Sequence, residues 1–260
     1  MDSIDATTVL RLALVPAAVW LASLAARRWG HRVSGYLGGM PLIGGPITYF
    51  LAADHGNAFA ARSATLTLAA ICGQAAHLLT FTYVGRAARW PVALAAGWSA
   101  FVASSLLVAW WDPAPAVALA LALASLFLGR LALPREGRVA SRPSVPPLEM
   151  RMRLIAAFAL AVLIVWSAAR FGPVVSGLLL SLPVTGSIMP PFTLTLYGPD
   201  AVARLARGFL VGLTGFTAFF FVLATTLVPW GAAASFGAAV AAALGAVALA
   251  ARVPRPGKKA

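Results

Sequence analysis

Two apolar stretches of the sequence carry helix breakers and small polar residues near their centres. The first runs from Val33 to Ala53 and the second from Val175 to Leu196. Both are long enough to cross a bilayer. Their breakers are Pro41, Gly44, Gly45 and Pro46 in the first stretch and Pro183, Gly186, Pro190 and Pro191 in the second. Because lipid cannot pair the backbone N–H and C=O groups that a break leaves open, each break must face protein or a water-filled cavity. We therefore place the candidate site at the two breaks.

The chemistry that a broken helix offers is anion binding. A half-helix that restarts at mid-membrane presents the positive end of its dipole, and Pro46 suits a first helical position because its missing N–H would be unpaired anyway. Two such ends, aimed from opposite sides, would favour an anionic group. The predicted substrate-binding residues are Gly44, Gly45, Pro46, Thr48, Tyr49, Thr185, Gly186, Ser187, Pro190 and Thr193. The alternative is a pair of proline kinks packed against neighbouring helices, although a bare kink does not need the accompanying small polar residues.

Ionisable and amide side chains inside apolar segments are the second group of candidates. Gln74 and His77 lie one helical turn apart, so they predict an inward polar face, and an ionisable residue inside a bilayer is costly enough to suggest function. The alternative for His77 is a structural histidine with satisfied hydrogen bonds. The predicted gating or coupling residues are Arg62, Arg204, Gln74, His77, Asp54 and His55. For Asp54 and His55 the alternative is a solvated turn.

Enzyme motifs are missing from the sequence. It holds no HExxH, no phosphate loop with its lysine and no GxSxG, and its acidic residues all lie at or near predicted loops. Cys72 is the only cysteine, so neither an internal disulfide nor a cysteine metal cluster can form. We expect a protein that is not an enzyme and that needs no cofactor or metal.

The composition determines the class of protein that positions these residues. Hydrophobic residues make up 61% of the 260 residues and charged residues only 10%, whereas a soluble domain has about 25% charged residues. The sequence predicts an all-α polytopic membrane protein. Its formal charge of +13 does not indicate nucleic-acid binding, because the basic residues gather in short segments between apolar spans.

Nine apolar segments can be drawn along the chain: 7–26, 33–53, 58–84, 91–110, 115–133, 152–170, 174–196, 201–227 and 230–251. With the N-terminus outside and the C-terminus in the cytoplasm, only Arg11, Arg62 and Arg170 lie outside, which is the bias that the positive-inside rule requires. If the broken segments were re-entrant loops, Arg86 and Arg89 would move outside and the bias would weaken. The expected location is a bacterial inner membrane.

The sequence also repeats itself. A shift of 142 residues places Arg11 on Arg153 and Val33-Ser34-Gly35 on Val175-Ser176-Gly177, and the matching of Gly, Pro and Arg continues for some seventy residues. The predicted units are repeat 1 (1–112), a linker span and cytoplasmic loop (113–150), repeat 2 (151–251) and a basic tail (252–260). Four spans plus one linker helix make an odd number of crossings, so the second repeat is inverted. Inverted repeats with discontinuous helices are typical of secondary transporters.

The stretch from Ser176 to Ala250, with its SGLLLSLPVTG, its GPDAVARLARG turn and the Phe-rich helix that follows, resembles the small four-span inner-membrane proteins of the GlpM type, here in tandem. The resemblance implies a four-helix repeat fold and supplies no catalytic motif or substrate.

The sequence therefore predicts a secondary transporter, or a flippase for a lipid-linked compound, that moves a small anionic substrate by alternating access around two broken helices. The alternatives are a passive channel and a scaffold for a membrane enzyme. The expected partners are the lipid bilayer and the substrate. Gly208 and Gly212 indicate close helix packing, within the protein or against a second copy in a homodimer.

Overall fold

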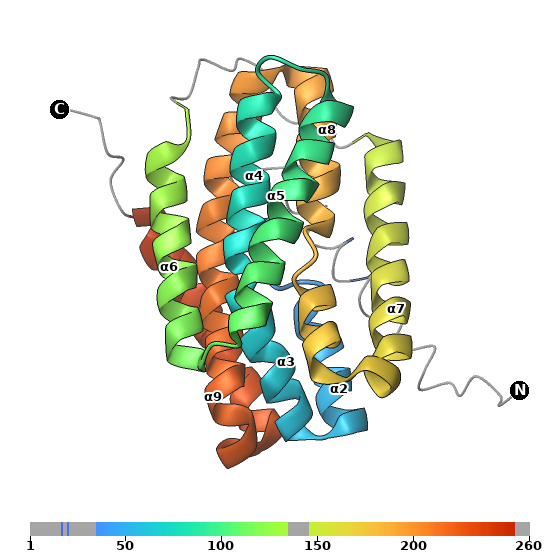
Figure 1. The fold of residues 1–260 in the computed structure, drawn as a ribbon, viewed down its shortest axis with the longest axis vertical. Coiled ribbons are helices and arrows are strands. Elements are labelled where there is room, and N and C mark those ends of the chain that lie inside the picture. Colours follow the sequence, from blue (N-terminus) through green and yellow to red (C-terminus); the bar gives the residue numbers. More distant parts are fainter. Residues whose placement is uncertain (1–16, 18–19, 21–34, 135–145, 253–260) are drawn as a thin grey trace, which may run out of the picture.

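The structure is a computed structural model that describes residues 17, 20, 35–134 and 146–252, and all regular structure in these residues is helical. A helical turn at 35–38 comes first. The helices that follow are α2 (Gly44–His55), α3 (Asn57–Ala69), α4 (Ile71–Val84), α5 (Trp90–Trp111), α6 (Pro115–Ala132), α7 (Pro147–Leu180), α8 (Val184–Tyr197) and α9 (Pro199–Arg252). Their axes follow the long axis of a single elongated bundle (Figure 1).

Five helical stretches in the described residues are long and apolar enough to cross a membrane: Asn57–Val84, Trp90–Val108, Pro115–Ala132, Arg170–Tyr197 and Pro199–Arg252. The last contains 54 residues, or about 80 Å of helix at 1.5 Å per residue, which exceeds twice the thickness of a bilayer core. It is broken at Gly231, where the backbone leaves the helical conformation. The all-α, multi-pass membrane character predicted from composition is therefore confirmed. The predicted segment 7–26 lies outside the described residues.

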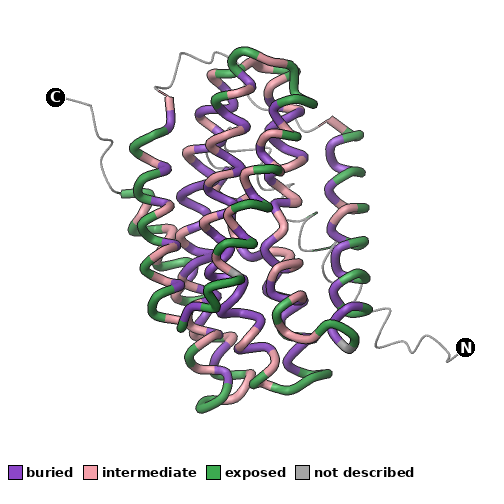
Figure 2. The backbone as a smooth tube through the Cα atoms, viewed as in Figure 1, coloured by how far each residue is buried: buried purple, intermediate pink, exposed green. Residues whose placement is uncertain are grey.

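Large apolar side chains cover the outside of this bundle. Ile155, Leu107 and Phe127 expose 68%, 67% and 63% of their surface, fractions that a soluble protein rarely tolerates in a continuous belt. Figure 2 shows the exposed positions of α7 on its side away from the bundle and the buried ones facing the other helices. The buried interior holds many Ala, Ser and Thr residues, and hydroxyls such as that of Thr82 donate to the carbonyl four residues earlier. Lipid is the solvent that suits such an exterior.

Four glycines reverse or bend the chain with positive φ angles: Gly56 (88°), Gly172 (70°), Gly198 (80°) and Gly231 (76°). Side chains disfavour this region, so glycine is the residue that permits the turns. Gly172 divides α7 and Gly231 divides α9, which matches the predicted boundaries between segments 152–170 and 174–196 and between 201–227 and 230–251. Gly56 and Gly198 stand after α2 and α8, 142 residues apart.

Both predicted breaks exist, but each helix restarts earlier than expected. The residues between 35–38 and α2 are non-helical, and α2 begins at Gly44 rather than at Pro46. Pro46 is the third helical residue, where its missing N–H still has no helical acceptor to lose. In the second stretch the helix ends at Leu180 and restarts at Val184, so Pro190 and Pro191 lie inside α8.

Close contacts between the two halves involve residue pairs that are related by the same shift of 142. A Cβ atom built on Gly177 would lie 2.6 Å from the carbonyl oxygen of Ser63, and one built on Gly35 would overlap the carbonyl oxygen of Leu205. Within each half, Gly73 meets the carbonyl oxygen of Phe101 at 3.0 Å, and Gly215 meets that of Ala243 at the same distance. The helical pairs α4–α5 and the two parts of α9 therefore pack in the same register.

Candidate functional site

The second broken segment runs alongside α3 and α4 in one direction through its break. Four pairs of contacts establish this course, in the order Ser63 Oγ to Pro173 O (3.1 Å), Thr67 Oγ1 to Gly177 O (3.0 Å), Gln74 Nε2 to Ser181 O (2.9 Å) and His77 Nε2 to Gly186 O (3.3 Å). Both numbers rise together, so the chain does not fold back at the break. A re-entrant loop would reverse this order, and the structure therefore favours a segment that continues across.

Gln74 and His77 do form the inward polar face that their spacing predicted. Gln74 exposes 7% of its surface and His77 only 1%. Both side chains reach backbone carbonyls of the second break, those of Ser181 and Gly186. These hydrogen bonds pair carbonyls that lipid could not satisfy, so the face stabilises the break directly.

The carbonyl of Gly186 needs such a partner because of the proline four residues later. In a continuous helix the N–H of residue 190 would bond to it, and Pro190 has no N–H. A carbonyl oxygen only accepts, so the Nε2 of His77 carries the proton and the ring is a donor at this position. Its Nδ1 packs against Gly97 of α5, and its ring edge meets Trp98.

A cavity of about 60 Å³ lies where the two breaks meet. The first break contributes residues 37–40 and 42–44, and the second contributes Leu180, Leu182 and 183–186. Gln74, Arg153, Leu160, Phe209 and Phe216 complete the lining. The first residues of α2 and of α8 both belong to this lining, so two helix N-termini converge on the cavity. Its volume suits a few water molecules or a small ligand.

Arg153 brings a cation to this cavity from the second turn of α7. Its side chain is 6% exposed and forms an ion pair with Glu149, one helical turn earlier, whose side chain is 7% exposed. Burial raises the pKa of the Glu149 carboxyl, and the neighbouring Arg153 opposes this rise. Buried charges are normally paired, and this pair meets that rule while keeping Arg153 at the cavity wall.

Among the predicted substrate-binding residues, Gly44, Thr185 and Gly186 line the cavity. Gly45 does not, because it packs against the ring of Phe219, to which a Cβ atom would come within 3.3 Å. Pro46 does not line the cavity either.

The other predicted residues of the two stretches lie elsewhere. The Thr48 hydroxyl donates to the carbonyl oxygen of Gly44 at 2.7 Å and is fully buried. Tyr49 is half exposed and meets the ring of Phe236 edge-on. In α8, Ser187, Pro190 and Thr193 pack away from the lining residues.

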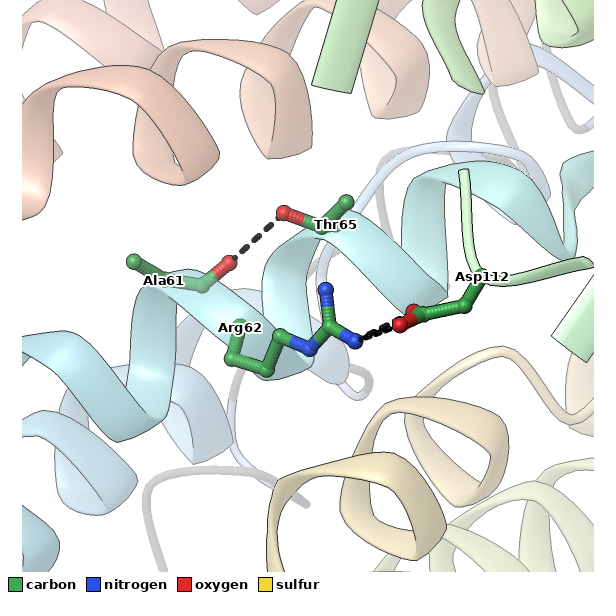
Figure 3. Close-up of polar contacts among 4 residues, drawn as sticks. All are labelled: Ala61, Arg62, Thr65 and Asp112. Atoms are coloured by element: carbon green, nitrogen blue, oxygen red, sulfur yellow. Dashed lines mark hydrogen bonds and ion pairs between the residues drawn. The ribbon is translucent and has the colours of Figure 1, made fainter. Parts of the chain in front are cut away.

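The predicted gating residues fall at other places in the bundle. Arg62 forms an ion pair with Asp112, which ties the start of α3 to the residue after α5 (Figure 3). The two side chains are 40% and 51% exposed, and neither lines the cavity. Arg204 lies half buried in α9 and is likewise outside the lining. Asp54 and His55 are exposed at the end of α2, where the His55 ring stacks on Phe59, as the solvated-turn alternative proposed.

Sequence reasoning missed Arg153 and Glu149, which it had assigned to topology or to a loop. One signal was present. Arg153 is the repeat partner of Arg11, which carries a positive charge on the outer side against the overall bias. An arginine kept at both positions has a reason beyond orientation. The position of Arg11 itself lies outside the described residues.

Comparison of the chain with known protein families, with curated protein sequences and with solved structures found no match.

Proposed function

We propose that this chain is a secondary transporter for a small anion that works by alternating access around its two broken helices. The observation that carries the proposal is the cavity shared by both breaks. Residues about 140 positions apart in the sequence meet there, with two helix N-termini and the Arg153 guanidinium on the wall. Helix N-termini and arginine both favour negative charge. The small volume favours a compact ligand over a lipid-linked one.

We further propose that the two halves are inverted repeats of four spans each and that the complete chain crosses the membrane nine times. Two contacts related by exchange support this arrangement, Gly177 against Ser63 and Gly35 against Leu205. Reciprocal contacts of this kind are what a two-fold axis between two units produces. In such transporters the substrate lies between the repeats near the bilayer centre, and rocking of one repeat against the other exposes it to each side in turn.

The test is counterflow in proteoliposomes with a panel of labelled small anions. A transporter gives saturable counterflow, a channel gives flux that does not saturate, and a scaffold gives none. A matched pair of variants in α8 assigns the flux to the cavity. Thr185→Leu adds bulk to a lining residue and should abolish counterflow, whereas Thr195→Leu changes an exposed threonine of the same helix and should preserve it. Equal flux in the two variants would place the pathway elsewhere.

A further inference from the structure

The Arg153–Glu149 ion pair resembles a ligand complex that the protein makes with itself. The guanidinium lines the cavity, yet its partner is a carboxylate of its own chain rather than a free anion. The planar fork of an arginine matches a carboxylate in shape. The rest of the wall is largely apolar, with leucines from both breaks and with Phe209 and Phe216 of α9. One cation in an apolar chamber suits an anion with a single charge and a hydrocarbon part.

We infer that Arg153 binds the carboxylate of a short organic monocarboxylate, which takes the place of Glu149, and that Glu149 accepts a proton as the ligand enters. This inference rests on the proposed transport function and deepens it. The exchange balances: the Glu149 carboxylate takes up one proton and becomes neutral, and the ligand carboxylate becomes the new partner of the guanidinium. One anion and one proton then cross together, so the cycle moves no net charge.

The surroundings of Glu149 support this exchange. Its carboxyl is buried, and burial disfavours the charged form, so the pKa is raised from its ordinary value of 4.5 despite the attraction of Arg153. Glu149 stands in the first turn of α7, ahead of the apolar segment 152–170. Loss of its charge removes the competitor for Arg153, so protonation and anion binding assist each other.

Arg153 is the one described charged group that acts on Glu149. Arg151, two residues away, is exposed. The described helices that pack against α7 are α2, α3, α5 and α8. Within their bounds α5 and α8 contain no Asp, Glu, Lys, Arg or His. The charged residues of α2 and α3 lie near Gly172, because Ser63 contacts Pro173, and that end of the helix is about 35 Å from Glu149.

The experiment measures binding by calorimetry with the purified full chain in detergent. The probes are acetate, propionate, butyrate and benzoate, with inorganic phosphate and sulfate for comparison, between about pH 5 and pH 8. Because one proton binds with each anion, the dissociation constant should rise about tenfold for each pH unit above the pKa of Glu149. Glu149→Gln should bind without this slope, and Glu149→Asp should keep it. Arg153→Gln should lose binding, and Arg151→Gln, its exposed neighbour, should retain it.

Glu149→Gln leaves a buried arginine without its carboxylate, so its fold needs a control. Gel filtration checks each variant, and the double variant Glu149→Gln/Arg153→Met, which removes both charges, should remain folded and bind nothing. Binding by the wild type without a pH slope, or an unchanged slope in Glu149→Gln, overturns the inference. Saturable flux of phosphate without monocarboxylate binding overturns the ligand class and leaves the transporter standing. Absence of saturable flux for every anion overturns the proposed function itself.

Discussion

The imidazole of His77 donates from Nε2 to the carbonyl oxygen of Gly186 at 3.3 Å, and Pro190 is the reason that this carbonyl is available. The equivalent carbonyl in the first half, 142 residues earlier, belongs to Gly44. There Thr48 replaces Pro190, and its hydroxyl donates to the Gly44 carbonyl at 2.7 Å. The first break therefore satisfies itself, whereas the second depends on a donor from another helix.

The residues that face the two breaks differ accordingly. The position equivalent to His77 in α9 is Phe219, whose ring packs against Gly45. The position equivalent to Gln74 is Phe216, which lines the cavity opposite the polar face of α4. A phenylalanine suffices where the backbone is already paired, and a donor is needed where a proline has removed one. The two halves thus share a backbone plan and differ in the chemistry of the facing helix.

The first prediction is that His77→Leu destabilises the protein and that Pro190→Thr restores it. Loss of the donor leaves a buried carbonyl unpaired, which costs about 1–3 kcal/mol. Threonine at position 190 supplies its own N–H and a hydroxyl, as Thr48 does in the first half. Thermal unfolding in detergent of the two single variants and the double variant measures the coupling. His77→Gln, which keeps a donor, is the control. Additive effects in the double variant would show that the two residues act separately.

Much of this architecture follows from sequence patterns alone. Hydrophobic length predicted the spans that the structure describes, and Gly and Pro predicted both breaks. The spacing of Gln74 and His77 predicted a polar face toward the interior, which is where both residues lie. These features are local, because a break or a helical face is determined by residues within a few turns of one another.

Contacts between distant segments could not be predicted in the same way. The restart of α2 at Gly44 depends on how closely Phe220 packs against that glycine, since a Cβ atom would come within 3.0 Å of its ring. The pairing of Arg62 with Asp112 joins residues fifty positions apart, and charge counting had assigned no partner to either. Glu149 had been placed in a loop because it follows a proline-rich stretch, yet it begins a helix and is buried. Each of these outcomes depends on packing across the bundle.

The second prediction concerns the close approach of helices at glycine. Gly177→Ala should strongly reduce thermal stability, because its Cβ atom would lie 2.6 Å from the Ser63 carbonyl oxygen and 2.8 Å from the Leu66 Cβ atom. Backbone atoms at these distances cannot move aside without separating the helices. Gly237→Ala is the matched control, since no atom lies within 4 Å of its Cβ position. This control should be neutral or stabilising by up to about 1 kcal/mol. Similar melting temperatures for the two variants would contradict the packing described.

The third prediction concerns the ion pair of Arg62 and Asp112. Because both side chains are well exposed, Arg62→Gln and Asp112→Asn should each cost no more than about 1 kcal/mol, and the double variant should cost no more than either alone. Asparagine also tolerates the positive φ of 50° at position 112. Thermal unfolding and counterflow are measured together. If Arg62→Gln abolishes flux and Asp112→Asn does not, Arg62 has a gating role that is independent of the pair.

The last prediction uses two ion pairs to assign residues to the ends of the bundle. Arg62 pairs with Asp112, so the start of α3 and the residue after α5 lie at one end. Arg86 and Asp200 lie 3.6 Å apart, so the residues that follow α4 lie at the same end as the start of α9. Since α4 and α5 form a hairpin between these pairs, the two ends should face opposite sides of the membrane. Single cysteines at the exposed positions Ala58, Ala114 and Ala87, on a Cys72→Ala background, should react accordingly with an impermeant reagent in intact cells. Under the positive-inside rule, positions 58 and 114 should be labelled from outside, and position 87 only after permeabilisation. Labelling of 58 and 87 from the same side would contradict a bundle in which α3 and α4 together cross the bilayer, and with it the inverted repeat.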